Sequence, residues 1–585
     1  MEIPILTVLL FLPLAFALGV WIFSGNDPVK TRLTALAGTA CVLVLAFVGI
    51  YREYNPTLSG LQFEEKREWI RSIHVYYHLG IDGLSMAMVL LVSLLTFLVV
   101  LASWQRVTNL KNFFALILLE EFGLLGAFMA LDFFHWFIFW EFSLIPMFFL
   151  IKFYGHESRN EAALKFFIYT LVGSVFLVLG FQFIYLSTGT WNFIELKELA
   201  RTGMLNEKLM AHWTSIQTGS DSLPWFFRGA VWMAQSFGAI LWKLFFPVRW
   251  LWGMSGGMAL TWLGFTFPEM TFPTVIALFV MAGFAVKVPI WPFHTWLPQT
   301  YTQAPTAGSI ILTALMSKMG VYGFLRIVLP LFHETILSMI LPLIWLALAS
   351  ILFGALAAFA QRDLKTLVAY SSLSHLGYCM LGVFIVVAGP QLAEDRVFAL
   401  NWVIFQMVAH GLSAAALFYF VGLLEQRCES LHFPPGARGR EVAGFRAIDA
   451  RAIDTYGGIR KTVPIFAGLM GITIFASLGL PGLCGFVGEF MIFKGSFSGT
   501  VLLWHYLALA VFGLLLTAIY LLTMAEKVFF GPQDPKWNAL PDLQGRELWF
   551  VSVPLVALMF IIGLYPAVVI NLSNATVMEF AKIFG

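Results

Sequence analysis

The sequence predicts an all-α polytopic membrane protein, and three observations lead to this fold class. Of the 585 residues, 59% are hydrophobic and only 12% are charged, whereas soluble domains carry roughly 25% charged residues. The mean hydropathy is +0.83. Apolar runs of about 20 residues recur along the chain, and each is long enough to cross a bilayer as one helix.

The apolar runs predict about fourteen transmembrane helices. They are expected at residues 3–24, 32–51, 82–103, 112–131, 133–153, 163–187, 273–302, 307–330, 335–360, 365–388, 397–424, 463–498, 501–527 and 548–571. A signal peptide is the alternative for the first run, Ile3 to Phe23. That run is longer than the apolar core of a signal peptide and lacks a basic start, so we interpret it as the first membrane helix.

Basic residues occupy alternate connections between the predicted helices. With the N-terminus outside, the inner connections contain Lys30 and Arg32, Arg106 and Lys111, Lys152 and Arg159, Arg362 and Lys365, a group from Arg427 to Lys461, and Lys527, Lys536 and Arg546. The outer connections are mixed or acidic, as in the segment from Glu64 to Glu68. Because inner loops of membrane proteins are enriched in Lys and Arg, the pattern places both termini on the outer side.

One region departs from the even spacing of helices. Residues 190–272 begin as an ordinary polar loop and then become rich in Trp, with Arg and Lys interspersed. Mixed Trp and Arg suit the membrane interface, so interfacial helices are preferred over an extra pair of crossings, and either choice preserves the orientation of the rest. The insertion is a candidate docking surface for another membrane subunit.

Two predicted helices contain residues that interrupt a helix within the bilayer. Pro289 and Pro292 lie in 273–302, and the segment LGLPGLCGF, Leu478 to Phe486, lies in 463–498. Paired discontinuous helices indicate inverted repeats. We therefore expect four parts: 1–111 with helices one to three, 112–330 as the first five-helix repeat with the insertion 190–272, 331–530 as the second repeat, and 531–585 with the last helix.

Several functional classes are disfavoured by composition and by missing motifs. The four cysteines lie far apart with no CxxC pair, so a zinc or iron–sulfur site is not indicated. We find no GxGxxG, GxxxxGK[ST] or HExxH sequence, and we therefore expect no nucleotide site on this chain. The formal net charge of +2 gives no argument for a nucleic-acid partner.

Ionisable residues inside the predicted helices are the candidate functional residues. A charged side chain at the bilayer centre costs at least about 2.5 to 3.5 kcal/mol, so its presence requires a reason. Glu141 lies at the centre of the fifth helix, Lys287 at the break of the seventh, and Lys318 deep in the eighth. The structural alternatives are a neutral hydrogen-bonded Glu and a Lys that only stabilises the break. We interpret the three residues as carriers of protons.

The second half of the chain carries three further candidates, His375, His410 and Glu489. Gln406, His410 and Ser413 form a polar stripe on an otherwise apolar helix. A buried structural histidine is the alternative, yet an ordinary pKa of about 6.5 suits histidine to a relay between a lysine and solvent. Metal binding is weakly supported.

Three more ionisable residues carry weaker signals. Glu120 and Glu121 are adjacent and point to different sides of the fourth helix, one toward the helix interior and the other toward a neighbouring subunit; we select Glu121 as a site candidate. Lys165 lies near a helix entrance, where its ammonium could also extend to the membrane surface.

These residues lie in segments that together resemble a known family. The segments are WEFSLIPMFFLI, KFFIYT, FAVKVPIWPFHTWLPQTYTQAPTAGS, VAYSSLSHLGY, MVAHGLSAAALF and LPGLCGFVGEF. They closely resemble the antiporter-like membrane subunits of respiratory complex I, NADH:quinone oxidoreductase. The resemblance covers nearly all of the membrane portion, and the Trp-rich insertion is the departure from it.

The resemblance implies a proton path along the membrane midplane. In it Glu141 pairs with Lys287, Lys318 is the central relay, His375 and His410 extend the path, and Glu489 ends it. It also implies that flavin, iron–sulfur clusters and quinone belong to partner subunits, with no cofactor on this chain. The implied partners are other membrane subunits of complex I, including neighbouring antiporter-like subunits, and the lipids of an energy-transducing membrane such as the bacterial inner membrane.

Two other functions are also compatible with the residues. One is a subunit of a cation/proton antiporter or membrane-bound hydrogenase of the same superfamily. Glu489 favours complex I, because the related antiporter-like chains generally resemble one another in carrying Lys there. The other is a membrane scaffold without transport, which the number of buried ionisable residues disfavours.

Overall fold

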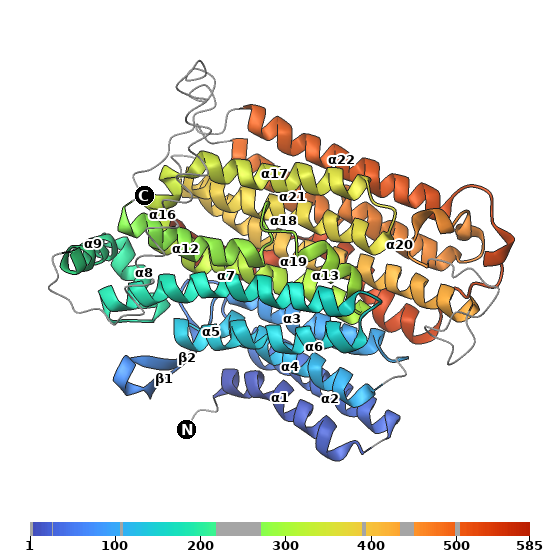
Figure 1. Cartoon of the computed structure of the whole chain (residues 1–585), viewed down its shortest axis with the longest axis horizontal. Coiled ribbons are helices and arrows are strands. Elements are labelled where there is room, and N and C mark those ends of the chain that lie inside the picture. The colour runs from blue at the N-terminus through green and yellow to red at the C-terminus, as the bar shows by residue number, and fades with distance from the viewer. Residues whose placement is uncertain are drawn as a thin grey trace.

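The chain folds into a bundle of helices that lie roughly side by side, with both termini at the same end (Figure 1). The computed structural model describes residues 4–25, 27–105, 109–217, 271–388, 393–432, 450–497 and 504–584. The Trp-rich part of the insertion, residues 218–270, lies outside the described residues, so its interpretation as interfacial helices stays a prediction.

The first half of the bundle begins with two peripheral helices and continues into the interior. Its helices are α1 (Ile5–Phe23), α2 (Pro28–Val44) extended by a π-helical turn to Tyr51, α3 (Gly83–Ala102), α4 (Leu110–Met129), α5 (Phe133–Phe142), α6 (Leu144–Tyr154), α7 (Arg159–Thr188), α8 (Phe193–Arg201), α9 (Met204–Gln217), α12 (Phe272–Lys287), α13 (Leu297–Gln303), α14 (Thr306–Ile311), α15 (Ser317–Gly323) and α16 (Leu329–Ser338).

The second half places its two longest buried helices at the centre. Its helices are α17 (Ile340–Phe359), α18 (Leu364–Ala388), α19 (Ala393–His432), α20 (Pro464–Ser477), α21 (Cys484–Phe497), α22 (Trp504–Phe529), α23 (Val553–Leu564) and α24 (Ala567–Ala581). Nearly all residues in the most apolar parts of α18, of α19 and of the helical segment from α14 to α16 (Thr306–Ser338) are buried. Lys318, His375 and His410 lie on these three elements and are buried.

Twelve helices in the described ranges are long and apolar enough to cross a membrane. The all-helical membrane architecture is thus confirmed. The two predicted interrupted helices are not among the twelve, because each is divided into shorter pieces. α12 ends at Lys287 and α13 begins at Leu297, while α20 ends at Ser477 and α21 begins at Cys484.

The two breaks follow from the residues within them. Pro289 and Pro292 have no N–H to donate to the preceding turn. In the second break Gly479 has φ +83° and Gly482 has φ +93°, in the left-handed region that favours glycine. Both breaks leave backbone groups and a side chain, Lys287 or Glu489, next to the interruption.

A two-stranded antiparallel ribbon interrupts the otherwise helical fold, which the sequence did not predict. β1 (Gln62–Ile70) pairs with β2 (Val75–Ile81), in the connection expected to be an acidic outer loop. The carboxylate of Glu65 in β1 accepts a hydrogen bond of 2.8 Å from the backbone N–H of Leu6. The ribbon thereby satisfies a backbone donor at the start of α1, which has no side-chain cap of its own.

The eighth helix loses helical geometry at Phe332 (φ −132°, ψ 28°), two residues past its predicted end, and a second helical piece then reaches Ser338. A π-helical turn from Phe324 to Val328 precedes Pro330 and places it in the first turn of α16. Two other expectations are wrong. The last predicted helix ends at Leu564 rather than 571, and α24 follows Pro566. Residues expected as a polar loop after 190 form α8 and α9.

Candidate functional site

The central candidate, Lys318 in α15, has no exposed surface. Its ammonium Nζ donates hydrogen bonds to the carbonyl oxygen of Thr313 at 2.6 Å and to Nδ1 of His410 at 2.8 Å. Because Nδ1 accepts from the lysine, a neutral His410 carries its proton on Nε2. That Nε2 is buried and has no hydrogen-bond partner among the described residues.

His410 faces a second histidine on the neighbouring helix. The ring centroids of His410 in α19 and His375 in α18 are 5.2 Å apart. His375 in turn contacts Glu489 in α21, with 2.5 Å between Nδ1 and Oε1. The side-chain amide of Gln406 donates to the same carboxylate oxygen at 3.2 Å. Four predicted residues, Lys318, His410, His375 and Glu489, therefore lie in one buried row, which we term the Lys318 row. Hydrogen bonds join its first two and its last two members, and the two imidazoles are in ring contact.

The remaining predicted pair, Glu141 and Lys287, does not form a direct ion pair. Their charges act on each other, yet no ion pair within 4.0 Å joins them in the described part of the chain. Lys287 Nζ instead lies 4.8 Å from the ring centroid of Trp140 and has no hydrogen-bond partner in those ranges. Trp140 Nε1 donates to Ser174 Oγ at 3.1 Å, which fixes the ring beneath the ammonium.

Glu120 is a further candidate, which the sequence pattern did not favour over Glu121. Its side chain is fully buried, neither carboxylate oxygen has a described hydrogen-bond partner, and its charge acts on Lys287. Lys287 thus lies within the field of two carboxylates, and we term Glu120, Glu141 and Lys287 the Lys287 cluster. Helical periodicity could not distinguish Glu120 from Glu121, because almost every residue of α4 is buried.

The two weaker candidates lie outside both groups. Glu121 is fully buried and accepts a short hydrogen bond from the hydroxyl of Thr96 in α3. The expectation that one of the adjacent glutamates faces outward is therefore wrong for this chain. Lys165 in α7 is half-buried, and its charge acts on His294 in the first break rather than on either group.

The Lys287 cluster and the Lys318 row meet where two backbones come close together. A Cβ added to Gly320 in α15 would lie 2.8 Å from the backbone nitrogen of Val288 and 3.1 Å from the carbonyl oxygen of Phe284. Only glycine permits this approach, and it brings the break after Lys287 against the helix that carries Lys318.

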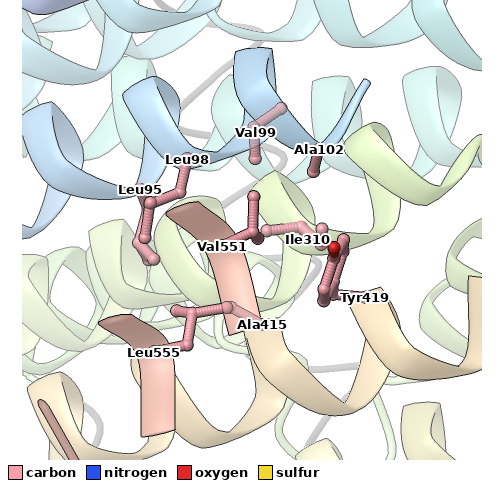
Figure 2. Close-up of a pocket in the computed structure, with 9 residues that line it drawn as sticks. All are labelled: Leu95, Leu98, Val99, Ala102, Ile310, Ala415, Tyr419, Val551 and Leu555. Carbon is pink, nitrogen blue, oxygen red and sulfur yellow. The ribbon is translucent and has the colours of Figure 1, made fainter. Parts of the chain in front are cut away.

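An apolar cavity lies between α3, α14, α19 and the start of α23, away from both groups (Figure 2). It is lined by aliphatic side chains and by Tyr419. Its volume is about 10 Å³, which is near the minimum needed to hold one water molecule. A cavity of this size and lining does not fit an organic cofactor.

A many-helix membrane bundle with a buried row of lysine, histidine and glutamate belongs to the class of proteins that move ions or protons across membranes. Residues 130–219 and 233–519 match the family model described as "NADH:quinone oxidoreductase/Mrp antiporter, TM". The chain belongs to this family, which confirms the resemblance drawn from its sequence segments.

Individual relatives agree with this assignment. NADH-quinone oxidoreductase subunit M of Rhodobacter capsulatus is 33% identical over 586 residues, covering 99% of this chain and 96% of that protein. A chain of respiratory complex I from Thermus thermophilus is 26% identical with a TM-score of 0.74, covering 99% of this chain and all of that one. A chain of the Mrp complex of a Dietzia species shares the fold, with a TM-score of 0.70 at 18% identity and full coverage of both chains.

Proposed function

We propose that this chain is the proton-translocating, antiporter-like subunit M of NADH:quinone oxidoreductase. The observation that carries the proposal is the Lys318 row: four buried ionisable side chains in succession, in a chain with full-length similarity to proteins of that name. A relay of this kind needs groups that both accept and release a proton, and imidazole does so at its two nitrogens.

The row supports transfer in small steps. Lys318 gives a proton to Nδ1 of His410, and His410 releases its Nε2 proton toward Nε2 of His375, which has no described partner. The 5.2 Å between ring centroids is short enough for a modest ring rotation or one bridging water. His375 then passes its Nδ1 proton to Glu489 across 2.5 Å.

The Lys287 cluster supplies the electrostatic control in this proposal. When Glu141 and Lys287 close to about 4 Å, an ion pair in an effective dielectric near 20 is worth roughly 4 kcal/mol. That energy is comparable to moving one charge through about 100 to 200 mV. Opening and closing the pair therefore changes the electrostatic potential at Lys318, by an energy comparable to the driving force for moving a proton.

The proposal includes an arrangement in the membrane. The twelve candidate spans and the two interrupted helices together make fourteen crossings, with residues 112–330 and 331–530 as inverted repeats. Both termini lie at one end of the bundle, as an even number of crossings requires (Figure 1). We place that end outside and the opposite end, with its basic connections, on the inner side of the bacterial inner membrane.

The partners follow from the same assignment. The chain operates with other membrane subunits of complex I, including neighbouring antiporter-like subunits, and is surrounded by lipid. Flavin, iron–sulfur clusters and quinone, and hence the redox chemistry, belong to partner subunits.

The experiment that tests this proposal uses membrane vesicles containing the complete complex. We expect Lys318→Ala and Glu141→Ala to assemble normally but to lower quinone reduction and proton pumping sharply, because each removes a group that the relay or its control requires. Normal pumping by an assembled Glu141→Ala enzyme would contradict the scheme.

A second candidate function is a subunit of a cation/proton antiporter, and the shared fold with the Mrp complex favours it over a membrane scaffold without transport. Vesicles containing the complex of this chain are expected to show no Na⁺-dependent proton exchange. Robust exchange driven by Na⁺ would support the antiporter instead.

A further inference from the structure

A second cluster of ionisable residues lies at the end of the bundle opposite the two termini, away from the site described above. Lys365 Nζ at the start of α18 lies 2.8 Å from Oε2 of Glu425 in α19 and donates to Nε2 of His156 at 2.8 Å. His156 lies between α6 and α7, with Nδ1 3.5 Å from Oε1 of Glu425. Arg451 Nε lies 3.7 Å from the same Oε1 of Glu425 and 3.2 Å from Oδ2 of Asp363.

The three central members differ in their access to water. The Lys365 side chain has no exposed surface and the Glu425 side chain is 7% exposed, whereas the His156 side chain is 26% exposed. The exposed imidazole therefore contacts the medium, and the lysine behind it does not. A proton moving inward would reach His156 first and Lys365 second.

Hydroxyl groups lie between this cluster and Lys318. The hydroxyl of Thr366, next to Lys365, is 3.0 Å from that of Thr302 in α13. Ser372 lies two turns along α18 from Lys365, about 10 Å, and its hydroxyl is 3.0 Å from that of Thr313. Thr313 is also the residue whose carbonyl accepts the hydrogen bond from Lys318. Hydroxyls both donate and accept, so the two pairs are polar steps between Lys365 and Thr313, and transfer from one pair to the next requires intervening water.

The opposite side of Lys318 is closed by a saturated ion pair. Arg326, two turns along the same helical segment, donates to both carboxylate oxygens of Asp82 at 2.6 Å each. Its Nε also donates to the hydroxyl of Tyr322 at 3.1 Å. Every oxygen of this carboxylate is engaged by a cation that does not release its proton. Hydroxyl groups therefore lie on the side of Lys318 that faces Lys365. On the side that faces the two termini, the Arg326–Asp82 ion pair blocks proton transfer.

We propose that His156, Lys365 and Glu425 form a proton-collecting site that supplies Lys318 through the hydroxyls of Ser372 and Thr313. This inference rests on the proposed function, which makes Lys318 a proton carrier and places this end of the bundle on the inner side. It adds the point at which protons enter.

The transfer balances within the cluster. Lys365 passes a proton inward along the hydroxyl route and becomes a neutral amine. The neutral His156 accepts from Lys365 at Nε2 and therefore carries its proton on Nδ1. It takes a proton from the medium, becomes an imidazolium and gives its Nε2 proton to the amine, which returns the ring to the same neutral form. Glu425 remains the counter-charge for both cations, with Arg451 and Asp363 as a second, paired couple beside it.

The test uses inverted vesicles of the complete complex, in which the inner side faces the medium. We expect His156→Gln to assemble normally and to lower pumping roughly tenfold in alkaline medium, where protons are scarce, with little loss in acidic medium. In His156→Ala, millimolar imidazole in the medium is expected to restore the rate, since it replaces the missing ring. A purely structural role would move neither the pH profile nor the response to imidazole.

The lysine provides a matched pair of variants. Lys527 forms an exposed pair of 3.0 Å with Asp454 at the same end of the bundle. Lys365→Met is expected to abolish proton pumping in alkaline medium, whereas Lys527→Met is expected to leave the pumping rate unchanged. If Lys365→Met does not assemble, the His156 variants decide the question alone.

The outcomes separate this inference from the proposed function. Normal pumping by Lys318→Ala would overturn the proposed function itself. Loss of pumping in Lys318→Ala together with a wild-type pH profile in His156→Gln, or with no imidazole rescue of His156→Ala, would overturn only the collecting site.

Discussion

Glu489→Gln removes one negative charge at the end of the Lys318 row and keeps the shape of the side chain. At the 2.5 Å between His375 Nδ1 and Glu489 Oε1, two unit charges in an effective dielectric near 20 interact by about 6 to 7 kcal/mol. Desolvation of the two buried groups offsets part of this energy. If about 3 kcal/mol survives as stabilisation of a protonated His375, its loss slows proton transfer by roughly a hundredfold.

The assay is proton uptake into inverted vesicles, followed with a pH-sensitive dye during NADH oxidation and normalised to assembled complex. Glu579→Gln is the matched control, because Glu579 forms an exposed pair with Lys582 at 2.7 Å on the last helix. We expect the control to pump at the wild-type rate. A fully assembled Glu489→Gln enzyme that pumps within twofold of wild type would refute the reasoning that the carboxylate charge drives the last step.

Two further predictions use residues of the first half. Glu120→Gln is expected to lower pumping severalfold while assembly stays normal, because it removes one of the two carboxylates acting on Lys287; vesicle pumping and the amount of complex on a native gel measure this. Burial raises the pKa of Asp132, the N-cap residue of α5, from 3.8 to about 6. The folded state thus binds the proton more tightly than the unfolded chain, and stability falls as the pH rises from about 4 through about 6. Asp132→Asn should flatten this dependence in thermal unfolding of the detergent-solubilised complex, and an unchanged slope would contradict the assignment.

The sequence was sufficient for the main helices, because a continuous apolar run in a chain this hydrophobic has few alternatives to a membrane helix. It was also sufficient for the members of the Lys318 row, since a lysine or glutamate at membrane depth is conspicuous. Their order in space was not deducible from the residues alone. His410 contacts Lys318 because two distant helices pack together, and helix packing leaves no local signal in either segment.

The features that were missed share a physical cause. The ribbon of β1 and β2 has a charged first strand with little alternation, so its pairing depends on contacts with α1 and α5. Glu120 and Glu121 lie on a helix with no exposed face to distinguish them. His156, Lys365 and Glu425 come from three segments, and each alone reads as an ordinary polar residue near a helix end.

The length of α19 has a mechanical consequence. This helix runs unbroken for 40 residues, about 60 Å, which is twice the thickness of the hydrocarbon core. It carries His410 near its middle and Glu425 fifteen residues later, so the two side chains move together when the helix moves. A lengthwise slide of about 1 Å would stretch the contact of His410 with Lys318 and that of Glu425 with Lys365 together, since both are 2.8 Å hydrogen-bond distances. In the proposed scheme, one movement of α19 therefore changes both the contact at the proton-collecting site and the contact in the Lys318 row.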